Sequence, residues 1–254
     1  MYQPTATILQ CSNQHFPTLF SYPRTGSNWL SYCIERISGF NVIGSDAHIG
    51  DISVERRLES DPKALVHKTH GGKLVCDLFM NNTNKEGLLL NIRNYKECIL
   101  RDAPNKPKYP KVHPITDISP KLKGLKNQDN SPDYLAMLEL YDKYDGPKIL
   151  IDYDDLILEP KKELKKLFVW LSQFGGNDDE EFLNKFMEDI DSHKKNSMSL
   201  YKRTHGTTAT DGDPKKLKIQ KETWLNNETE NEIDEYVEKI SPLLYEKYLK
   251  RYKL

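Results

Sequence analysis

The chain has 254 residues, of which 37% are hydrophobic and 30% are charged, and its formal net charge at pH 7 is -1. This length suits one large α/β domain, and no low-complexity linker divides the sequence, so we expect a single domain over residues 1–254. A chain with balanced charge has no global attraction to nucleic acid or to an anionic membrane. Any anion-binding site must therefore be local.

The cysteines and the N-terminus indicate a compartment. The four cysteines, at positions 11, 33, 76 and 98, form no C-x-x-C pair, and such sparse thiols fit a reducing cytoplasm better than a disulfide framework or a zinc site. The N-terminus lacks a basic region followed by a long apolar run, and no stretch is long enough to span a bilayer. We expect a cytoplasmic protein with no membrane or nucleic-acid partner.

The first predicted elements lie within Phe16–Ile37, where an apolar, strand-like run stops at the turn Pro23-Arg24-Thr25-Gly26 and an amphipathic helix follows. The first turn of a helix has N–H groups without internal partners and carries the positive end of the helix dipole, so it binds phosphate or sulfate favourably. Gly26 allows the backbone to approach an anion closely, and Arg24 supplies a charged fork that matches oxyanion geometry. Ser27-Asn28 adds polar side chains. The pattern predicts an anion site.

Three further apolar runs are predicted as strands, and polar residues end each of them: Ala64–His67 before Lys68-Thr69-His70, Gly87–Ile92 before Arg93-Asn94, and Lys148–Tyr153. Helices are predicted over residues 73–81, 95–103, 134–144, 161–174, 178–190 and 228–252, the last interrupted at Ser241-Pro242. Polar loops are predicted over residues 41–61, 103–132 and 191–222. Strands that alternate with helices predict an α/β fold, with a central, mostly parallel sheet flanked by helices. Its ligands would bind at the carboxyl ends of the strands.

The turn sequence Tyr22-Pro23-Arg24-Thr25-Gly26-Ser27-Asn28-Trp29-Leu30 resembles the 5′-phosphosulfate loop of the cytosolic sulfotransferase family, whose usual form is Tyr-Pro-Lys-Ser-Gly-Thr-Thr-Trp-Leu. Three more motifs follow in the family's order: Lys68-Thr69-His70 for Lys-Thr-His, Arg93-Asn94 for Arg-Asn, and Tyr153-Asp154-Asp155-Leu156 for Tyr-Glu-Asp-Leu. A Walker A loop is absent from the sequence, because Gly72-Lys73 is followed by Leu74. The resemblance implies a P-loop-like sulfotransferase architecture.

The resemblance also implies a reaction and a set of residues for it. The donor would be 3′-phosphoadenosine 5′-phosphosulfate (PAPS), the product 3′-phosphoadenosine 5′-phosphate (PAP), and the acceptor a hydroxyl or amine of a polar small molecule, glycan or peptide, with no metal required. His70 would be the general base, and Lys68 and Arg24 would stabilise charge on the leaving phosphate.

The residues that the resemblance assigns to the donor fall into four groups. They are the turn residues Arg24, Thr25, Gly26, Ser27, Asn28 and Trp29; Arg93 and Arg101 at the 3′-phosphate; Tyr153, with Trp29, at the adenine; and Lys202 and Arg203, a loose equivalent of the family's late Arg-Lys-Gly loop. Arg101 stands eight residues after Arg93, where the family normally has a serine.

Other interpretations remain open at this point. Trp29 and Tyr153 can serve packing alone, and His67, inside its strand, is expected to be a core residue. Asp152 could hold magnesium in a metal-dependent nucleotide or small-molecule kinase, although the lysine loop of such a kinase is missing from the sequence. A non-catalytic module that binds anions through Arg24 and the lysines of residues 103–126 is the third reading.

Overall fold

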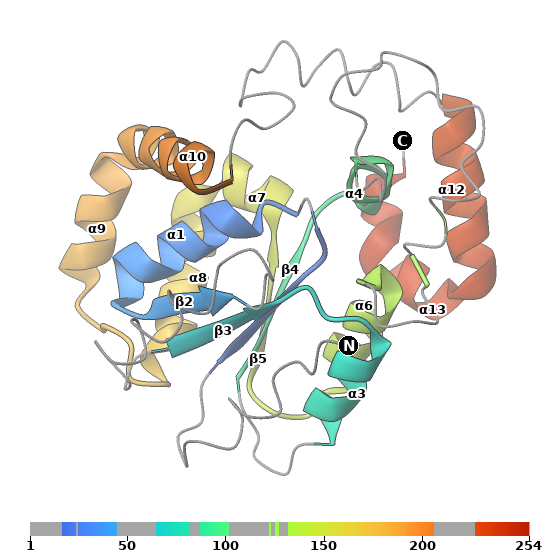
Figure 1. Cartoon of the computed structure of the whole chain (residues 1–254), viewed down its shortest axis with the longest axis horizontal. Coiled ribbons are helices and arrows are strands. Elements are labelled where there is room, and N and C mark those ends of the chain that lie inside the picture. Colours follow the sequence, from blue (N-terminus) through green and yellow to red (C-terminus); the bar gives the residue numbers. More distant parts are fainter. Residues whose placement is uncertain are drawn as a thin grey trace.

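The computed structural model describes the following residues: 17–23, 25–44, 65–81, 87–101, 122, 125–126, 132–205 and 227–253. Within them, a five-stranded sheet with the order β2-β3-β1-β4-β5 forms the centre of the molecule (Figure 1). Its strands are β1 (Thr18–Ser21), β2 (Asn41–Gly44), β3 (Leu65–Thr69), β4 (Leu88–Ile92) and β5 (Lys148–Asp152). All neighbouring strands run parallel, which confirms the predicted α/β sheet.

Helices cover both faces of this sheet. One face packs on α1 (Ser27–Ser38) and α8 (Pro160–Ser172), with α9 (Glu180–Glu188) and α10 (Ile190–His205) beyond them. The other face packs on α3 (Lys73–Met80), α6 (Tyr134–Lys143) and the C-terminal helices. Successive strand residues alternate between the two cores: Leu19 and Leu89 belong to the α1–α8 side, and Phe20 and Leu90 to the α3–α6 side. Burial on both faces explains why the strands are continuous apolar runs.

The C-terminal segment, residues 227–253, begins with α12 (Asn227–Ile240) and continues after a break at Ser241. The continuation consists of α13 (Pro242–Leu244), a π-helical turn (Tyr245–Leu249) and a 3₁₀ turn (Lys250–Tyr252). Val237 and Leu249 are fully buried in the α3–α6 side core. The predicted helix and its interruption at Pro242 are confirmed.

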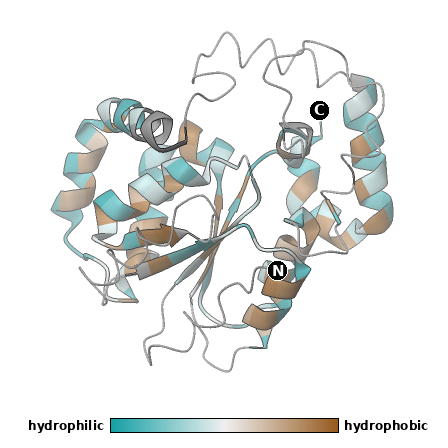
Figure 2. Ribbon diagram, viewed as in Figure 1, coloured by the Kyte–Doolittle hydropathy of each residue, from teal (hydrophilic) through white to brown (hydrophobic). Residues whose placement is uncertain are grey.

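Two predicted loops contain regular structure. Residues 41–44 form the edge strand β2, which pairs with β3, and residues 190–205 form α10. Only two apolar residues, Val42 and Ile43, mark β2, so the sequence carried little strand signal. The helix α10 is largely hydrophilic (Figure 2) and lacks an apolar stripe, but His193 stacks on Phe186 with ring centroids 4.3 Å apart. Tertiary contact therefore overrides the weak local pattern. Residues 206–222 and most of 103–132 lie outside the described residues.

Two short helices complete the described structure. The helix α4 (Tyr95–Arg101) follows β4 after Arg93-Asn94, and α7 (Tyr153–Leu158) follows β5 directly. Within the described ranges, no helix is long and apolar enough to cross a membrane.

Candidate active site

Lys68, His70 and Arg93 lie at the carboxyl edge of the sheet. The central strand β1 ends at Ser21, and its neighbours β3 and β4 pair with it so that Phe20 lies opposite Thr69 and Ser21 opposite Asn91. Lys68 and His70 therefore flank the turn that follows β1 on one side, and Arg93 flanks it on the other. Parallel pairing alone brings together residues that are up to seventy positions apart in the sequence.

Gly26 gives the turn between β1 and α1 its shape. Its backbone is left-handed, with φ 79° and ψ 19°, and it caps α1 without a side-chain hydrogen bond from the described residues. A Cβ atom at Gly26 would lie 2.2 Å from the ring of Tyr153, so no other side chain fits. In the first turn of α1, the Trp29 N–H group donates to the Gly26 carbonyl at 3.0 Å, and the positive end of the helix dipole at this turn favours an anion.

Asn91, which the sequence analysis did not select, anchors this turn. Its Nδ2 atom donates hydrogen bonds to the carbonyl oxygen and the Oγ1 atom of Thr25, both at 3.1 Å, and Thr25 Oγ1 donates to the Tyr22 carbonyl at 2.8 Å. Asn91 and Thr25 are 1% and 0% exposed, so water does not compete for these bonds. The signal was present: Asn91 is the one polar residue in the apolar strand GLLLNI.

Lys68 places a buried positive charge beside the first turn of α1. The residue is 7% exposed, and its Nζ atom donates a hydrogen bond to Asn28 Oδ1 at 2.8 Å. An oxyanion bound at the adjacent helix terminus would lie close to this ammonium group and interact favourably with it. This hydrogen bond connects β3 to the first turn of α1.

His70 contacts the end of β1 through one ring nitrogen. Its Nδ1 atom lies 2.6 Å from the Ser21 carbonyl oxygen and 3.1 Å from Ser21 Oγ. A carbonyl only accepts hydrogen bonds, so Nδ1 carries the proton in the neutral ring and the lone pair resides on Nε2. The backbone thus selects the tautomer that presents a basic Nε2 atom.

Arg93 is enclosed by groups from α4 and α7, which we call the Arg93 cluster: Arg93, Glu97, Tyr153 and Asp154. Its Nη2 atom lies 2.8 Å from Glu97 Oε2, its Nε atom lies 4.0 Å from Asp154 Oδ1, and its guanidinium lies 4.7 Å from the centroid of the Tyr153 ring. Burial favours the neutral form, but Glu97 and the other neighbouring acidic groups raise the pKa of Arg93 overall. The cluster holds a permanent cation next to the ring that packs on Gly26.

Of the other residues predicted to bind the donor, the structure describes Trp29 in full, and the basic residues only in part or not at all. The Trp29 ring is 9% exposed and stacks on Tyr32 and Phe186, with centroids 5.9 and 6.3 Å away. Arg24 lies outside the described residues. Arg101 is the last residue of α4, and Lys202 and Arg203 belong to the end of α10, where the side chains are not described. Their predicted roles remain predictions.

Asp152, which the kinase interpretation assigns to magnesium, forms hydrogen bonds and an ion pair within the protein. It is 1% exposed, caps α7 by accepting a hydrogen bond from Asp154 N at 2.9 Å, accepts another from the Tyr252 hydroxyl, and pairs with Arg251 at 3.2 Å. His67, expected from the sequence to be a core residue, is half-buried on β3, where desolvation lowers its pKa to about 4.

The chain is similar to known proteins in structure. No protein-family model matches the chain, and no curated protein sequence matches it. Among solved structures, it is similar to mouse sulfotransferase SULT7A1 complexed with PAP, with a TM-score of 0.59 and 21% identity over 95% of this chain and 90% of that chain. A sugar kinase from Janibacter sp. aligns with a TM-score of only 0.33 and 9% identity, over 63% of this chain and 95% of that chain.

Proposed function

We propose that this chain, whose fold is that of the cytosolic-type sulfotransferases, transfers a sulfuryl group from PAPS to a hydroxyl or amine and releases PAP. The observation that carries the proposal is the convergence of Gly26, Lys68 and His70 at the carboxyl end of β1. This arrangement joins an anion-binding helix terminus, a buried cation and a base of defined tautomer. PAP is the ligand of the similar mouse enzyme, and we propose it as the product here.

The residues present suit a phosphosulfate group. The first turn of α1 has no side-chain cap from the described residues, and the buried ammonium of Lys68 donates a hydrogen bond to Asn28 Oδ1 beside that turn. Both features favour an exogenous anion at this position. We also propose that Arg24, Thr25, Ser27 and Asn28 contribute to binding it.

In the proposed mechanism, PAPS supplies an activated sulfuryl group, and the protein surrounds it with charged and hydrogen-bonding groups in fixed positions. His70 Nε2 accepts the proton of the acceptor as its oxygen or nitrogen attacks, while the Nδ1 hydrogen bond to Ser21 steadies the imidazolium that forms. Lys68 and the amides of the α1 first turn stabilise the negative charge that develops on the leaving phosphate. Because these donors are fixed before the reaction, they need no reorganisation during it.

We propose that the Arg93 cluster reads the 3′-phosphate, with Arg101, Lys202 and Arg203 as further contacts. The Arg93 side chain is 12% exposed, with Glu97 Oε2 2.8 Å from Nη2 and Asp154 Oδ1 4.0 Å from Nε. Such a pre-positioned fork recognises a phosphate by paired hydrogen bonds. Tyr153 contacts both Gly26 and Arg93, and we propose that it links the two phosphate sites and, with Trp29, borders the adenine.

The acceptor is proposed at the level of its chemical class. We propose a polar small molecule, glycan or peptide, because the segments predicted to wall the pocket, residues 41–61, 103–132 and 191–222, are rich in polar residues. We further propose that residues 1–254 act as a single sulfotransferase domain, since helices from both ends of the described chain pack on one sheet.

The donor assignment predicts that the protein binds PAP more tightly than AMP, and that Arg93→Ala removes this preference. The loss should be roughly 10- to 100-fold in PAP affinity, as expected for a charge-assisted contact worth about 1.5–3 kcal/mol, with little change for AMP. Isothermal titration calorimetry with both nucleotides measures it. Arg36→Ala, on the outer face of α1, is the matched control and should bind both as the wild type does. Equal affinity of the wild type for PAP and AMP would refute the assignment.

A further inference from the structure

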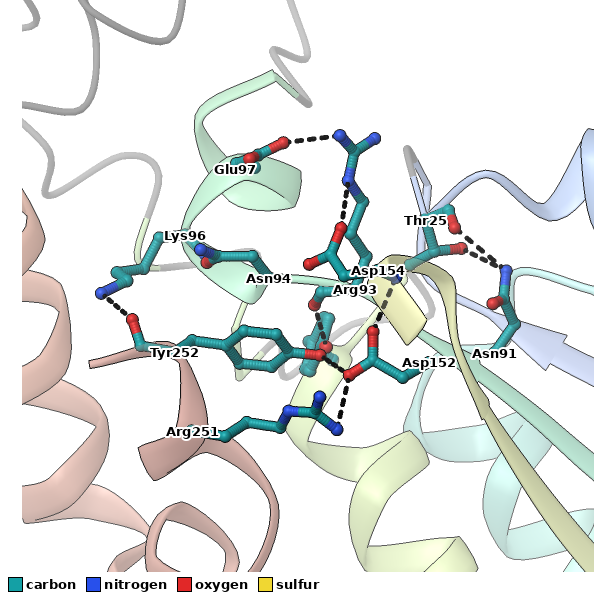
Figure 3. Close-up of polar contacts among 11 residues, drawn as sticks. Thr25, Asn91, Arg93, Asn94, Lys96, Glu97, Asp152, Asp154, Arg251 and Tyr252 are labelled. Atoms are coloured by element: carbon teal, nitrogen blue, oxygen red, sulfur yellow. Dashed lines mark hydrogen bonds and ion pairs between the residues drawn. The ribbon is translucent and has the colours of Figure 1, made fainter. Parts of the chain in front are cut away.

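The C-terminal segment connects the two helices that hold Arg93 (Figure 3). Glu97 belongs to α4, whereas Tyr153 and Asp154 belong to α7, and these helices follow different strands of the sheet. The last described residues of the chain contact both elements: Tyr252 bonds to Lys96 on α4 through its carbonyl and to Asp152, which precedes α7, through its hydroxyl. A single residue therefore bridges the two sides of the Arg93 cluster.

On the α7 side, the C-terminal segment makes its contacts through the Tyr252 hydroxyl and the Arg251 guanidinium. The Tyr252 hydroxyl donates to Asp152 Oδ2, while Arg251 makes two hydrogen bonds to the carboxylate of Asp155, at 2.9 and 2.6 Å. Arg251 also lies 3.2 Å from Asp152. Asp152 is the cap of α7, so these bonds act on the residue that sets where α7 begins. Tyr153 and Asp154 are the first two residues of that helix.

On the α4 side, the contact is a buried lysine. Lys96 is 0% exposed and donates to the Tyr252 carbonyl at 2.8 Å, while Glu230 and Asp234 of α12 lie 3.1 and 3.2 Å from its Nζ atom. Tyr95 adds a hydrogen bond from its hydroxyl to Asp234. Lys96 directly precedes Glu97, which pairs with Arg93.

These contacts point to a role for the C-terminal segment in ligand recognition. Within the Arg93 cluster, the separation of Glu97 from Tyr153 and Asp154 depends on how α4 and α7 are placed relative to each other. In the described structure, Tyr252 joins them through hydrogen bonds that are shielded from water, since Asp152 and Tyr252 are 1% and 9% exposed. Buried bonds to charged groups are strong and directional, so they can fix such a placement.

We propose that Tyr252 and Arg251 are positioning residues, which set the geometry of the Arg93 cluster and thereby its selectivity for a 3′-phosphorylated nucleotide. This inference rests on the proposed function, because it assigns the 3′-phosphate to Arg93. Neither residue touches the ligand in this proposal. Both act through Asp152, Asp155 and α7.

The test compares two variants with one matched control. Tyr252→Phe removes only the hydroxyl that binds Asp152, and Arg251→Gln removes an exposed partner of Asp152 and Asp155 without opening the core. The control, Tyr248→Phe, removes a hydroxyl on the same segment, whose partner is Asp142 on α6 at 2.8 Å, away from the Arg93 cluster. For each protein, the dissociation constants of PAP and AMP are measured by calorimetry, and thermal unfolding is followed in parallel.

The ratio of AMP to PAP dissociation constants decides the outcome. Tyr252→Phe and Arg251→Gln should reduce this ratio by roughly two- to tenfold, the usual range for a substitution that acts through a neighbouring element, whereas Tyr248→Phe should leave it unchanged even if it lowers the Tm. A Tyr252→Phe protein with a lower Tm and an unchanged ratio of AMP to PAP dissociation constants would overturn this inference and leave the proposed function standing. A wild-type protein with no preference for PAP would overturn the proposed function, and the inference with it.

Discussion

At the scale of single residues, the geometry of the site depends on which side-chain atoms form hydrogen bonds within the protein. His70 uses Nδ1 for the Ser21 carbonyl, and Lys68 reaches the turn through Asn28. Both side chains are therefore oriented by partners on β1 and α1, the two elements on either side of the turn at Gly26. Fixed orientation of this kind lowers the cost of reaching the reactive geometry.

The proposed role of His70 as general base predicts that its replacement lowers turnover. Replacing His70 with Ala should reduce turnover by roughly 10²- to 10⁴-fold, the usual contribution of a general base, because alanine cannot accept the proton. Binding of PAP should change little, since His70 faces the acceptor in the proposed mechanism. The measurement is transfer of radiolabelled sulfate from PAPS to pools of polar acceptors, with PAP affinity determined on the same preparation. Undiminished transfer would assign the base to another residue, and binding without transfer in the wild type would favour the non-catalytic module.

At the scale of elements, α12 is held against α4 by charges rather than by apolar contact alone. Lys96 is enclosed by Glu230, Asp234 and the Tyr252 carbonyl, and each of these groups is buried or nearly so. Removing one member of a buried ionic cluster leaves the others unpaired in a medium of low polarity. The attachment of the C-terminal segment is therefore sensitive to a single side chain.

This arrangement predicts that Lys96→Met destabilises the protein by roughly 3–5 kcal/mol, because Glu230 and Asp234 would remain buried without a cation. Urea denaturation at neutral pH measures the change. Lys73→Met is the control, since Lys73 forms an exposed pair with Asp77 and its removal should have little effect. Similar unfolding midpoints for the two variants would contradict the buried cluster.

At the scale of the whole molecule, the free energy of unfolding depends on pH through groups whose pKa differs between the folded and the unfolded chain. His67 is an example, because burial lowers its pKa from 6.5 to about 4. The unfolded chain binds a proton at this residue below pH 6.5, whereas the folded chain binds it only near pH 4. Folding stability should therefore be fully present above pH 6.5 and decrease as the pH falls toward 4.

The His67 contribution should amount to about 2 kcal/mol between pH 7 and pH 5, which follows from 1.36 kcal/mol for each unit of pKa shift. The change is isolated by measuring the free energy of unfolding at both pH values for the wild type and for His67→Gln, which cannot titrate. The variant should lose less stability over this interval than the wild type does. An equal loss in both proteins would show that His67 is protonated in the folded state as readily as in the unfolded state.

Much of the architecture followed from local sequence signals. The strands at residues 88–92 and 148–152 are apolar runs bounded by glycine or proline, and α8 is a long amphipathic segment that starts at Pro160. The two misassigned segments, β2 and α10, lacked such signals. The edge strand β2 gains its structure by pairing with β3, and α10 gains its own from contacts of His193 with Tyr32 and Phe186. Local patterns cannot report contacts with residues that are distant in the sequence.

The sequence by itself determined the turn at Gly26, the strand that precedes His70, and the order of the motifs, because these features depend on neighbouring residues. Only the tertiary structure decided that Asn91 anchors Thr25, that Tyr153 packs on Gly26, and that Tyr252 bonds to Asp152. These contacts join residues separated by 66, 127 and 100 positions, and nothing in a local pattern specifies such partners. They form because parallel pairing places the strand ends at one edge, where buried polar groups must find partners.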